Sequence, residues 1–99
     1  MVRPRLCRRI GRRPGITYFK PAGVRMRNLD EVILTVDEYE AVRLKDLNGL
    51  DQEVAAKQMK ISQPTFNRLI KIARKKISDA IINGKAIRVQ GGNVSFHRP

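Results

Sequence analysis

The sequence is poor in the residues on which catalytic and metal sites depend. It contains one cysteine, one histidine and no tryptophan. Cys7 and His97 supply too few ligands for a zinc site, and a Ser-His-Asp triad would have to use that one histidine. No glycine-rich phosphate loop precedes a predicted helix. The sequence therefore predicts a protein that is not an enzyme and has no cofactor or metal. A redox role for Cys7, which lies among arginines, is the alternative.

Long apolar segments are also missing. No run of 18 apolar residues occurs, so we expect no membrane-spanning helix and no membrane partner. The first residues are charged and lack the apolar core of a secretory signal, and one cysteine permits no internal disulfide. Both features favour a cytoplasmic protein. A chain of 99 residues forms one domain, in which we expect no large enclosed substrate cavity.

The sequence has a large excess of positive charge, with a net charge of +12. Residues 1–29 hold nine bases and no acid, residues 30–62 hold four bases and eight acids, and residues 63–99 hold eight bases and one acid. Two basic blocks around an acidic middle favour a polyanionic partner over an evenly solvated surface.

Residues 1–34 are predicted to form an extended basic arm and linker. Pro14-Gly15 and the Pro-Ala-Gly segment 21–23 mark turns. Residues 31–34 form either a short strand or one helical turn, and the pattern does not decide between them. The arm is rich in arginine, which the narrow minor groove of DNA attracts.

Residues 35–84 are predicted to form a domain of three helices. The first runs from about Val36 to Leu47, with Thr35 and Glu38 at capping-box spacing and Asn48-Gly49 at its end. Its early carboxylates are assigned to a favourable interaction with the helix macrodipole rather than to catalysis or metal binding. These carboxylates are Asp37, Glu38 and Glu40.

The second helix is expected from Gln52 to Met59 after a cap at Asp51, with Val54, Ala55 and Met59 facing inward. The third is expected to extend to about Ile82, with Ser62 or Gln63 as its cap. Its apolar residues recur at the i, i+3, i+4, i+7 spacing of a buried helix face. They are Phe66, Leu69, Ile70, Ala73, Ile77, Ala80 and Ile81.

The connection Lys60-Ile61-Ser62 is short enough to make the second and third helices cross steeply, as in a helix-turn-helix. The small Ala55 and Ala56 allow a close approach. Lys60 occupies a turn position where glycine is common, because the backbone there has a positive φ. A plain bundle with a basic amphipathic helix is the alternative. The turn spacing and the charge favour the helix-turn-helix.

Residues 85–99 are predicted to form a short β tail. Ile87, Val89, Val94 and Phe96 alternate around Gly91-Gly92, which is a weak hairpin pattern. Because an isolated hairpin is marginally stable, we expect it to pack on the arm, on residues 31–34 or on a second copy. A homodimer is therefore one of the expected assemblies.

Residues 35–77 resemble the helix-turn-helix of sigma factor region four and of related response-regulator output domains. The matching features are the Thr-x-x-Glu start and the segments GLDQEVAAKQMKIS and TFNRLIKIARKKI. Nearly the whole chain resembles a family of uncharacterised prokaryotic proteins predicted to bind DNA, through RPRLCRRI, YFKPAG, residues 29–77 and GKAIRVQGG. The resemblance implies a cytoplasmic DNA-binding regulator without substrate or cofactor. Lys60 departs from the glycine that such sequences usually carry in the turn.

The predicted fold is mainly α, and the predicted function is sequence-specific binding of double-stranded DNA by a transcriptional regulator. By alignment with the helix-turn-helix pattern, the base-contacting positions are Ser62, Gln63, Asn67, Arg68 and Lys71. The predicted phosphate contacts are Lys57, Arg74, Lys75, Lys76, Arg8, Arg9, Arg12 and Arg13. The alternatives are an RNA- or ribosome-associated basic protein and an adaptor whose acidic first helix contacts RNA polymerase. Aromatic side chains, on which RNA modules stack bases, are few, and this favours DNA.

Overall fold

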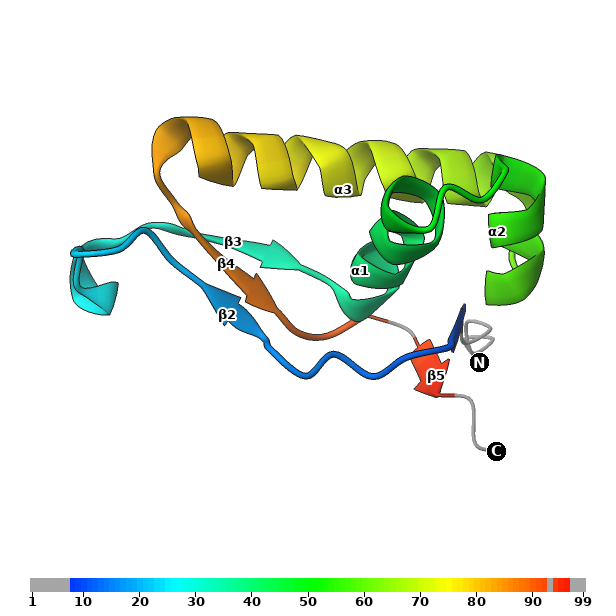
Figure 1. The fold of residues 1–99 in the computed structure, drawn as a ribbon, viewed down its shortest axis with the longest axis horizontal. Helices are drawn as coiled ribbons and strands as arrows, with labels where there is room; N and C mark the ends of the chain where they lie inside the picture. The colour runs from blue at the N-terminus through cyan, green and yellow to red at the C-terminus, as the bar shows by residue number, and fades with distance from the viewer. Residues whose placement is uncertain (1–7, 93, 97–99) are drawn as a thin grey trace, which may run out of the picture.

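The computed structural model describes residues 8–92 and 94–96. The chain is mainly α with a small sheet, which confirms the predicted fold class. The long helix α3 (Gln63–Asn83) spans the molecule, with α1 (Val36–Val42) and α2 (Gln52–Met59) at one end and the sheet under its other end (Figure 1). Cys7 and His97 lie outside the described residues, so the redox hypothesis for Cys7 stays a prediction.

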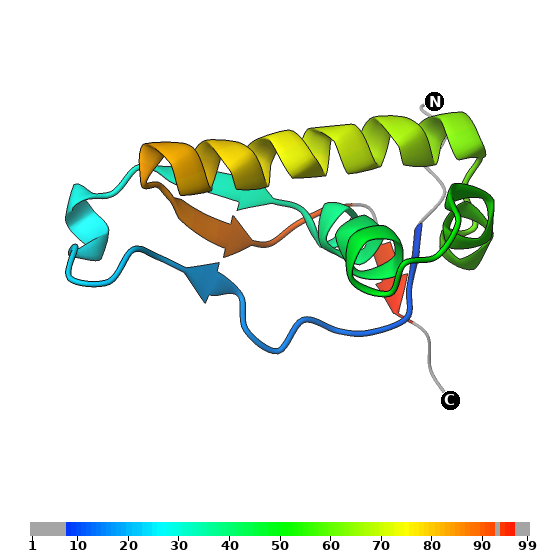
Figure 2. The same cartoon turned by 45° about the horizontal axis from the view of Figure 1, so that its top comes forward.

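Three short strands form the sheet that supports the C-terminal half of α3. They are β2 (Tyr18–Phe19), β3 (Glu31–Leu34) and β4 (Ala86–Val89), in the order β2-β4-β3. Strand β4 is antiparallel to β2 and parallel to β3. Parallel strands need a long crossover connection, and the connection from β3 to β4 contains all three helices. Figure 2 shows α3 lying across this sheet. The structure thus decides that residues 31–34 form a strand rather than a helical turn.

The predicted hairpin in the tail is wrong. Strand β4 pairs with β2 and β3, whereas β5 (Val94–Phe96) pairs in parallel with β1 (Arg8–Ile10). Between β4 and β5 the chain passes along the start of α1, where the Val36 amide donates to the Gly91 carbonyl over 3.0 Å. Strands β4 and β5 therefore pair with strands that are distant in sequence rather than with each other. Ala86 and Val89 are buried in the chain's own core, so they do not offer a surface to a second copy.

The start of α1 follows the capping prediction. The Glu38 amide donates to Thr35 Oγ1, and the Thr35 amide donates to Glu38 Oε1 over 2.9 Å. The helical path continues to Leu47 as predicted, but Arg43–Leu47 is wound as a π-helix, with the Asn48 amide donating to the Arg43 carbonyl. A short helix η1 (Met26–Asn28) in the arm had no sequence signal.

The connection between α2 and α3 has the predicted length and backbone. Lys60 adopts the left-handed conformation, with φ of 57°. The Lys60 amide donates to the Lys57 carbonyl and the Ile61 amide donates to the Ala56 carbonyl, the two bonds of a Schellman motif. Ser62 caps α3 and accepts from the Thr65 amide, so Gln63 is the first helical residue and not the cap. Asp51 has the extended backbone of a cap, but its side chain makes no capping bond.

The core has two parts, and both pack against Val36 and Val42 of α1. The first joins α2 and α3 to β1 through Phe66, Met59 and Ile10, none of which is exposed. The second joins the middle of α3 to the sheet through Ala73, Leu34 and Val89. Two inward assignments were wrong, because Val54 is 42% exposed and Ile81 is 71% exposed. Within the described part of the chain, no helix has the length and apolarity to cross a membrane.

Candidate nucleic-acid interface

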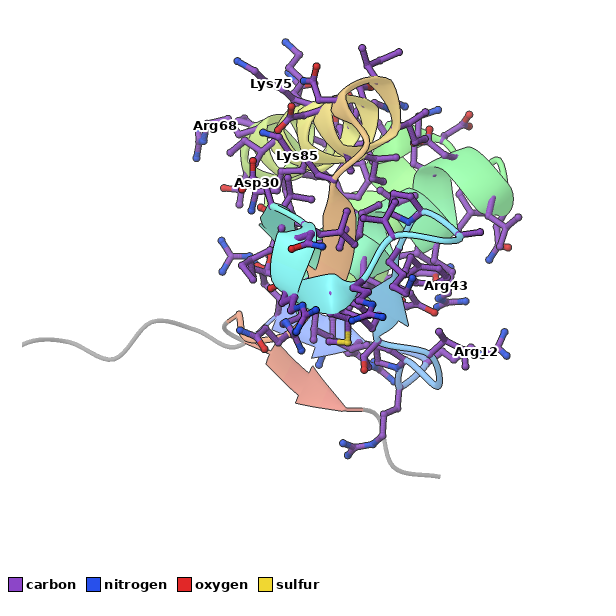
Figure 3. The ribbon with its side chains drawn as sticks, turned by 90° about the vertical axis from the view of Figure 1, so that its left-hand side faces the viewer. Arg12, Asp30, Arg43, Arg68, Lys75 and Lys85 are labelled. Carbon is purple, nitrogen blue, oxygen red and sulfur yellow. The ribbon has the colours of Figure 1, made fainter. Side chains whose placement is uncertain are left out.

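The outward face of α3 carries a row of basic side chains. Arg68, Lys71 and Lys75 are exposed, and their spacing of three and four residues places them on one side of the helix. The opposite side of α3 is buried through Phe66 and Ala73. Figure 3 shows Arg68 and Lys75 pointing away from the body of the molecule on the α3 side. The amphipathic pattern in the sequence therefore fixes which side chains this helix presents.

The first turns of α3 are held by hydrogen bonds among polar side chains. The Ser62 hydroxyl donates to Thr65 Oγ1 over 2.9 Å, and Arg68 Nη2 donates to the same oxygen over 3.3 Å. Asn67, which is half-buried, accepts a bond of 3.1 Å from Gln52 Nε2 at the start of α2. Sequence reasoning missed Gln52 and Thr65. The one sequence signal for Thr65 was its position, three residues after Ser62 and three residues before Arg68.

The carboxylates of α1 are not on the surface. Asp37, Glu38 and Glu40 are all buried. Arg8 Nε lies 3.4 Å from Asp37 Oδ2, and Lys76 Nζ lies 2.7 Å from Glu38 Oε1. These contacts join the arm and α3 to the start of α1. These carboxylates bind cations of their own chain, so they do not form the exposed acidic surface that the adaptor hypothesis used.

Glu40 joins the arm to α1 through its carboxylate. Its carboxylate accepts from Arg43 Nε over 2.6 Å and from Arg43 Nη2 over 2.8 Å. It also accepts from the Gly11 amide over 2.7 Å, which fastens the arm to α1. A Cβ on Gly11 would lie 2.9 Å from Arg43 Nη2, so only glycine fits this close approach without a shift.

Ion pairing leaves the outward face of α3 with an excess of positive charge, although the charge of Lys75 acts on Asp79 and contributes to the lowered pKa of that carboxyl. Six of the nine carboxylates in the sequence are in ion pairs with bases of the same chain. Among the described residues, neither Lys71 nor Lys75 has a carboxylate at ion-pair distance, and Arg68 contacts only a hydroxyl. These three bases therefore give the outward face of α3 a local excess of positive charge.

Several predicted phosphate contacts have other partners in the structure. Arg74 donates to Asp46 through Nε and Nη2, and this bond raises the pKa of Arg74 and lowers the pKa of Asp46. Lys76 and Arg8 are partly buried against Glu38 and Asp37, so we remove both from the candidate surface. Both members of this pair lie at the surface, where the Arg74 side chain is 50% exposed.

The remaining predicted contacts lie in two places. Lys57 and Gln63 are exposed, on α2 and at the start of α3. Arg12 lies on the opposite side of the molecule from Arg68 (Figure 3), so the two do not form one surface. Arg9 and Arg13 belong to the same arm and have contacts within the chain. Over residues 8–92 and 94–96, no cluster of three or more metal-binding side chains occurs.

The fold and this surface define a class: a small, mainly α protein with one electropositive helix face. The chain belongs to the family described as "Protein of unknown function DUF134", whose model matches residues 1–97. It is 61% identical over 93 residues to a UPF0251 protein of Thermoanaerobacter pseudethanolicus, covering 94% of this chain and 79% of that protein.

Two further relatives carry the same family name. The UPF0251 protein of Caldanaerobacter subterraneus subsp. tengcongensis is 59% identical over 97 residues, covering 98% of this chain and 82% of the relative. The UPF0251 protein of Moorella thermoacetica is 58% identical over 92 residues, covering 93% of this chain and 62% of the relative. No solved structure shows a significant match to the chain.

Proposed function

We propose that this protein binds double-stranded DNA in a sequence-specific way and acts as a transcriptional regulator, with α2 and α3 as a helix-turn-helix. The observation that carries the proposal is the row of Arg68, Lys71 and Lys75 on the outward face of α3, none of which forms an ion pair with a carboxylate of the described residues. An α-helix fits the major groove, where its first turns contact base edges.

The short connection between α2 and α3 supports the same proposal. The Schellman motif at Lys60 and the bond from Gln52 to Asn67 fix α2 against the start of α3. In a helix-turn-helix the first helix crosses the DNA backbone while the second enters the groove. Lys57 on α2 is exposed and is positioned for a phosphate contact in such a complex.

RNA binding is the second candidate, and the aromatic side chains argue against it. Phe66 is fully buried, and Tyr18 lies under the Arg88 guanidinium, 4.6 Å from the ring centroid. Tyr39 is half-buried. Of the four aromatic side chains whose exposure the structure describes, only Phe19 is exposed, so these four form no row of rings for stacking bases.

Affinity for duplex DNA is expected to fall steeply with salt. Each neutralised phosphate releases counterions and contributes about −0.9 to the slope of log Kobs against log salt concentration. Phosphate contacts from Lys57 and Lys75 give a slope of about −2. Fluorescence anisotropy with a mixed-sequence duplex, from low to physiological salt, measures this slope. A flat response, or stronger binding to duplex RNA of the same length, would reject the proposal.

Substitutions on α3 are expected to separate base contacts from phosphate contacts. With a duplex selected from a random pool and a scrambled control, Arg68→Ala or Asn67→Ala should reduce discrimination by about 1–3 kcal/mol. Lys75→Ala should weaken both duplexes alike and lower the salt slope by about 1. Arg27→Ala, in η1 at the far end of the molecule, is the control and should behave as the unchanged protein.

Equal losses on both duplexes for every α3 variant would show that the base-contacting assignment is wrong, while leaving DNA binding itself intact.

A helix-turn-helix commonly works in pairs on half-sites about 34–36 Å apart, and we propose a dimer on DNA for this reason. RNA polymerase remains a proposed partner only through surfaces other than the buried carboxylates of α1.

A further inference from the structure

An apolar cavity of about 310 Å³ opens on the side of the molecule away from the outward face of α3. It lies between α1, the underside of α3 and the sheet. Val42 and Tyr39 of α1, Ile77 of α3, Ile87 of β4 and Phe19 of β2 form its walls. Its volume is at the lower end of the range for small-molecule sites. The cavity borders the contacts that hold α3 on the sheet but includes none of the residues proposed to contact DNA bases.

Two arginines line the opening, and they differ in their partners. Arg43 uses Nε and Nη2 for Glu40, and this bond raises the pKa of Arg43. Arg12 is exposed, and none of the ion pairs among the described residues includes it. Figure 3 shows Arg12 and Arg43 on the same side of the molecule. Arg12 is therefore the cation at this opening that has no carboxylate.

We propose that the cavity binds a small ligand with a flat apolar body and one carboxylate, which Arg12 holds at the opening. The guanidinium presents a planar set of donors that matches a carboxylate through two parallel bonds. The apolar walls contact the apolar body of the ligand. Burial of a charged group there without a partner is costly, so the carboxylate stays at the opening. Phe19 and Tyr39 favour a ring, because aromatic side chains pack against one another with defined geometry.

The arm places Arg12 before any ligand arrives. The Gly11 amide donates to the buried Glu40 carboxylate over 2.7 Å, so the residue before Arg12 is fixed to α1. A binding group held in advance loses less freedom when the ligand binds, and this favours affinity. The cavity is too small for a protein domain or a second copy of the chain, so the ligand we propose is a small molecule.

The test uses 2-naphthylacetate as the probe and NMR spectra of the isotopically labelled full chain. We expect saturable shifts for the methyl groups of Val42, Ile77 and Ile87 and none for Ile82, which is 80% exposed and outside the cavity. The neutral analogue 2-(2-naphthyl)ethanol should bind about tenfold more weakly, which is about 1.4 kcal/mol.

Arg12→Gln should weaken the acid about tenfold, whereas Arg27→Gln, an exposed arginine far from the cavity, should leave its affinity unchanged. Both variants should retain the spectrum of the folded protein, because both side chains are exposed. No saturable shifts at the cavity, or equal binding of acid and alcohol, would overturn the proposal. Equal affinity in Arg12→Gln would do the same. The readout involves no nucleic acid, so it is independent of whether the protein binds DNA.

Discussion

Replacement of Phe66 by alanine is expected to lower the free energy of unfolding by about 3–5 kcal/mol. The Phe66 side chain is 0% exposed and packs in the core where α2, α3 and β1 meet, with Met59 and Ile10. Truncation removes the apolar contact and leaves a cavity that the surrounding helices fill only in part. Because a small domain is stable by about 5–15 kcal/mol, this loss is a large fraction of the total.

Thermal and denaturant unfolding of the variant measure this loss. Ile82→Ala is the matched control on the same helix, since Ile82 is 80% exposed and its truncation should change stability by less than about 0.5 kcal/mol. If Phe66→Ala melted close to the unchanged protein, the side chain would not be buried as described. Stacking of Phe66 on nucleic acid would then become the better interpretation.

The helices were predictable because their signals are local. Thr35 with Glu38, the extended Ser62 before Pro64, and Gly84 after α3 mark helix ends within a few residues of sequence. The left-handed Lys60 followed from the length of the turn alone. The errors at Val54 and Ile81 lie at the edges of apolar stripes, where periodicity does not show whether another element covers the side chain.

The sheets were not predictable because their strands are short and their partners are distant. Strand β2 has two residues, too few to show an alternating pattern, and it pairs with residues 87–88. The Gly91-Gly92 pair was interpreted as a hairpin turn, which local sequence favours. In the structure the long-range pairings of β1 with β5 and of β2 with β4, all within one chain, replace that local pairing.

The candidate site was predictable only in part, because helical periodicity is a local signal whereas ion pairing joins residues that are distant in sequence. Arg68, Lys71 and Lys75 follow from helical periodicity and are exposed as expected. The roles of Arg8 and Lys76 did not follow, because each forms an ion pair with a carboxylate 29 or 38 residues away in sequence. Residue type alone does not distinguish a cation that is available to DNA from one that neutralises a buried acid.

Replacement of Glu40 by alanine is expected to lower the free energy of unfolding by about 3 kcal/mol. The Glu40 side chain is 2% exposed and accepts from both Arg43 and the Gly11 amide. Removal of one member of a buried pair costs about 3–5 kcal/mol, since the remaining charge and donor lose their partner. The lower value applies here because the Arg43 side chain is 20% exposed and regains some water.

Chemical denaturation and hydrogen exchange together test this expectation. Glu53→Ala removes an exposed carboxylate from α2 and should change stability by less than about 0.5 kcal/mol. The double variant Glu40→Ala/Arg43→Ala should be less destabilised than the sum of the single variants, because the arginine no longer lacks its partner. The Gly11 amide should lose its protection from hydrogen exchange in Glu40→Ala and keep it in Glu53→Ala. A Glu40→Ala protein as stable as Glu53→Ala would show that the arm is not held to α1 by this carboxylate, and the position of Arg12 at the cavity would then lack its support.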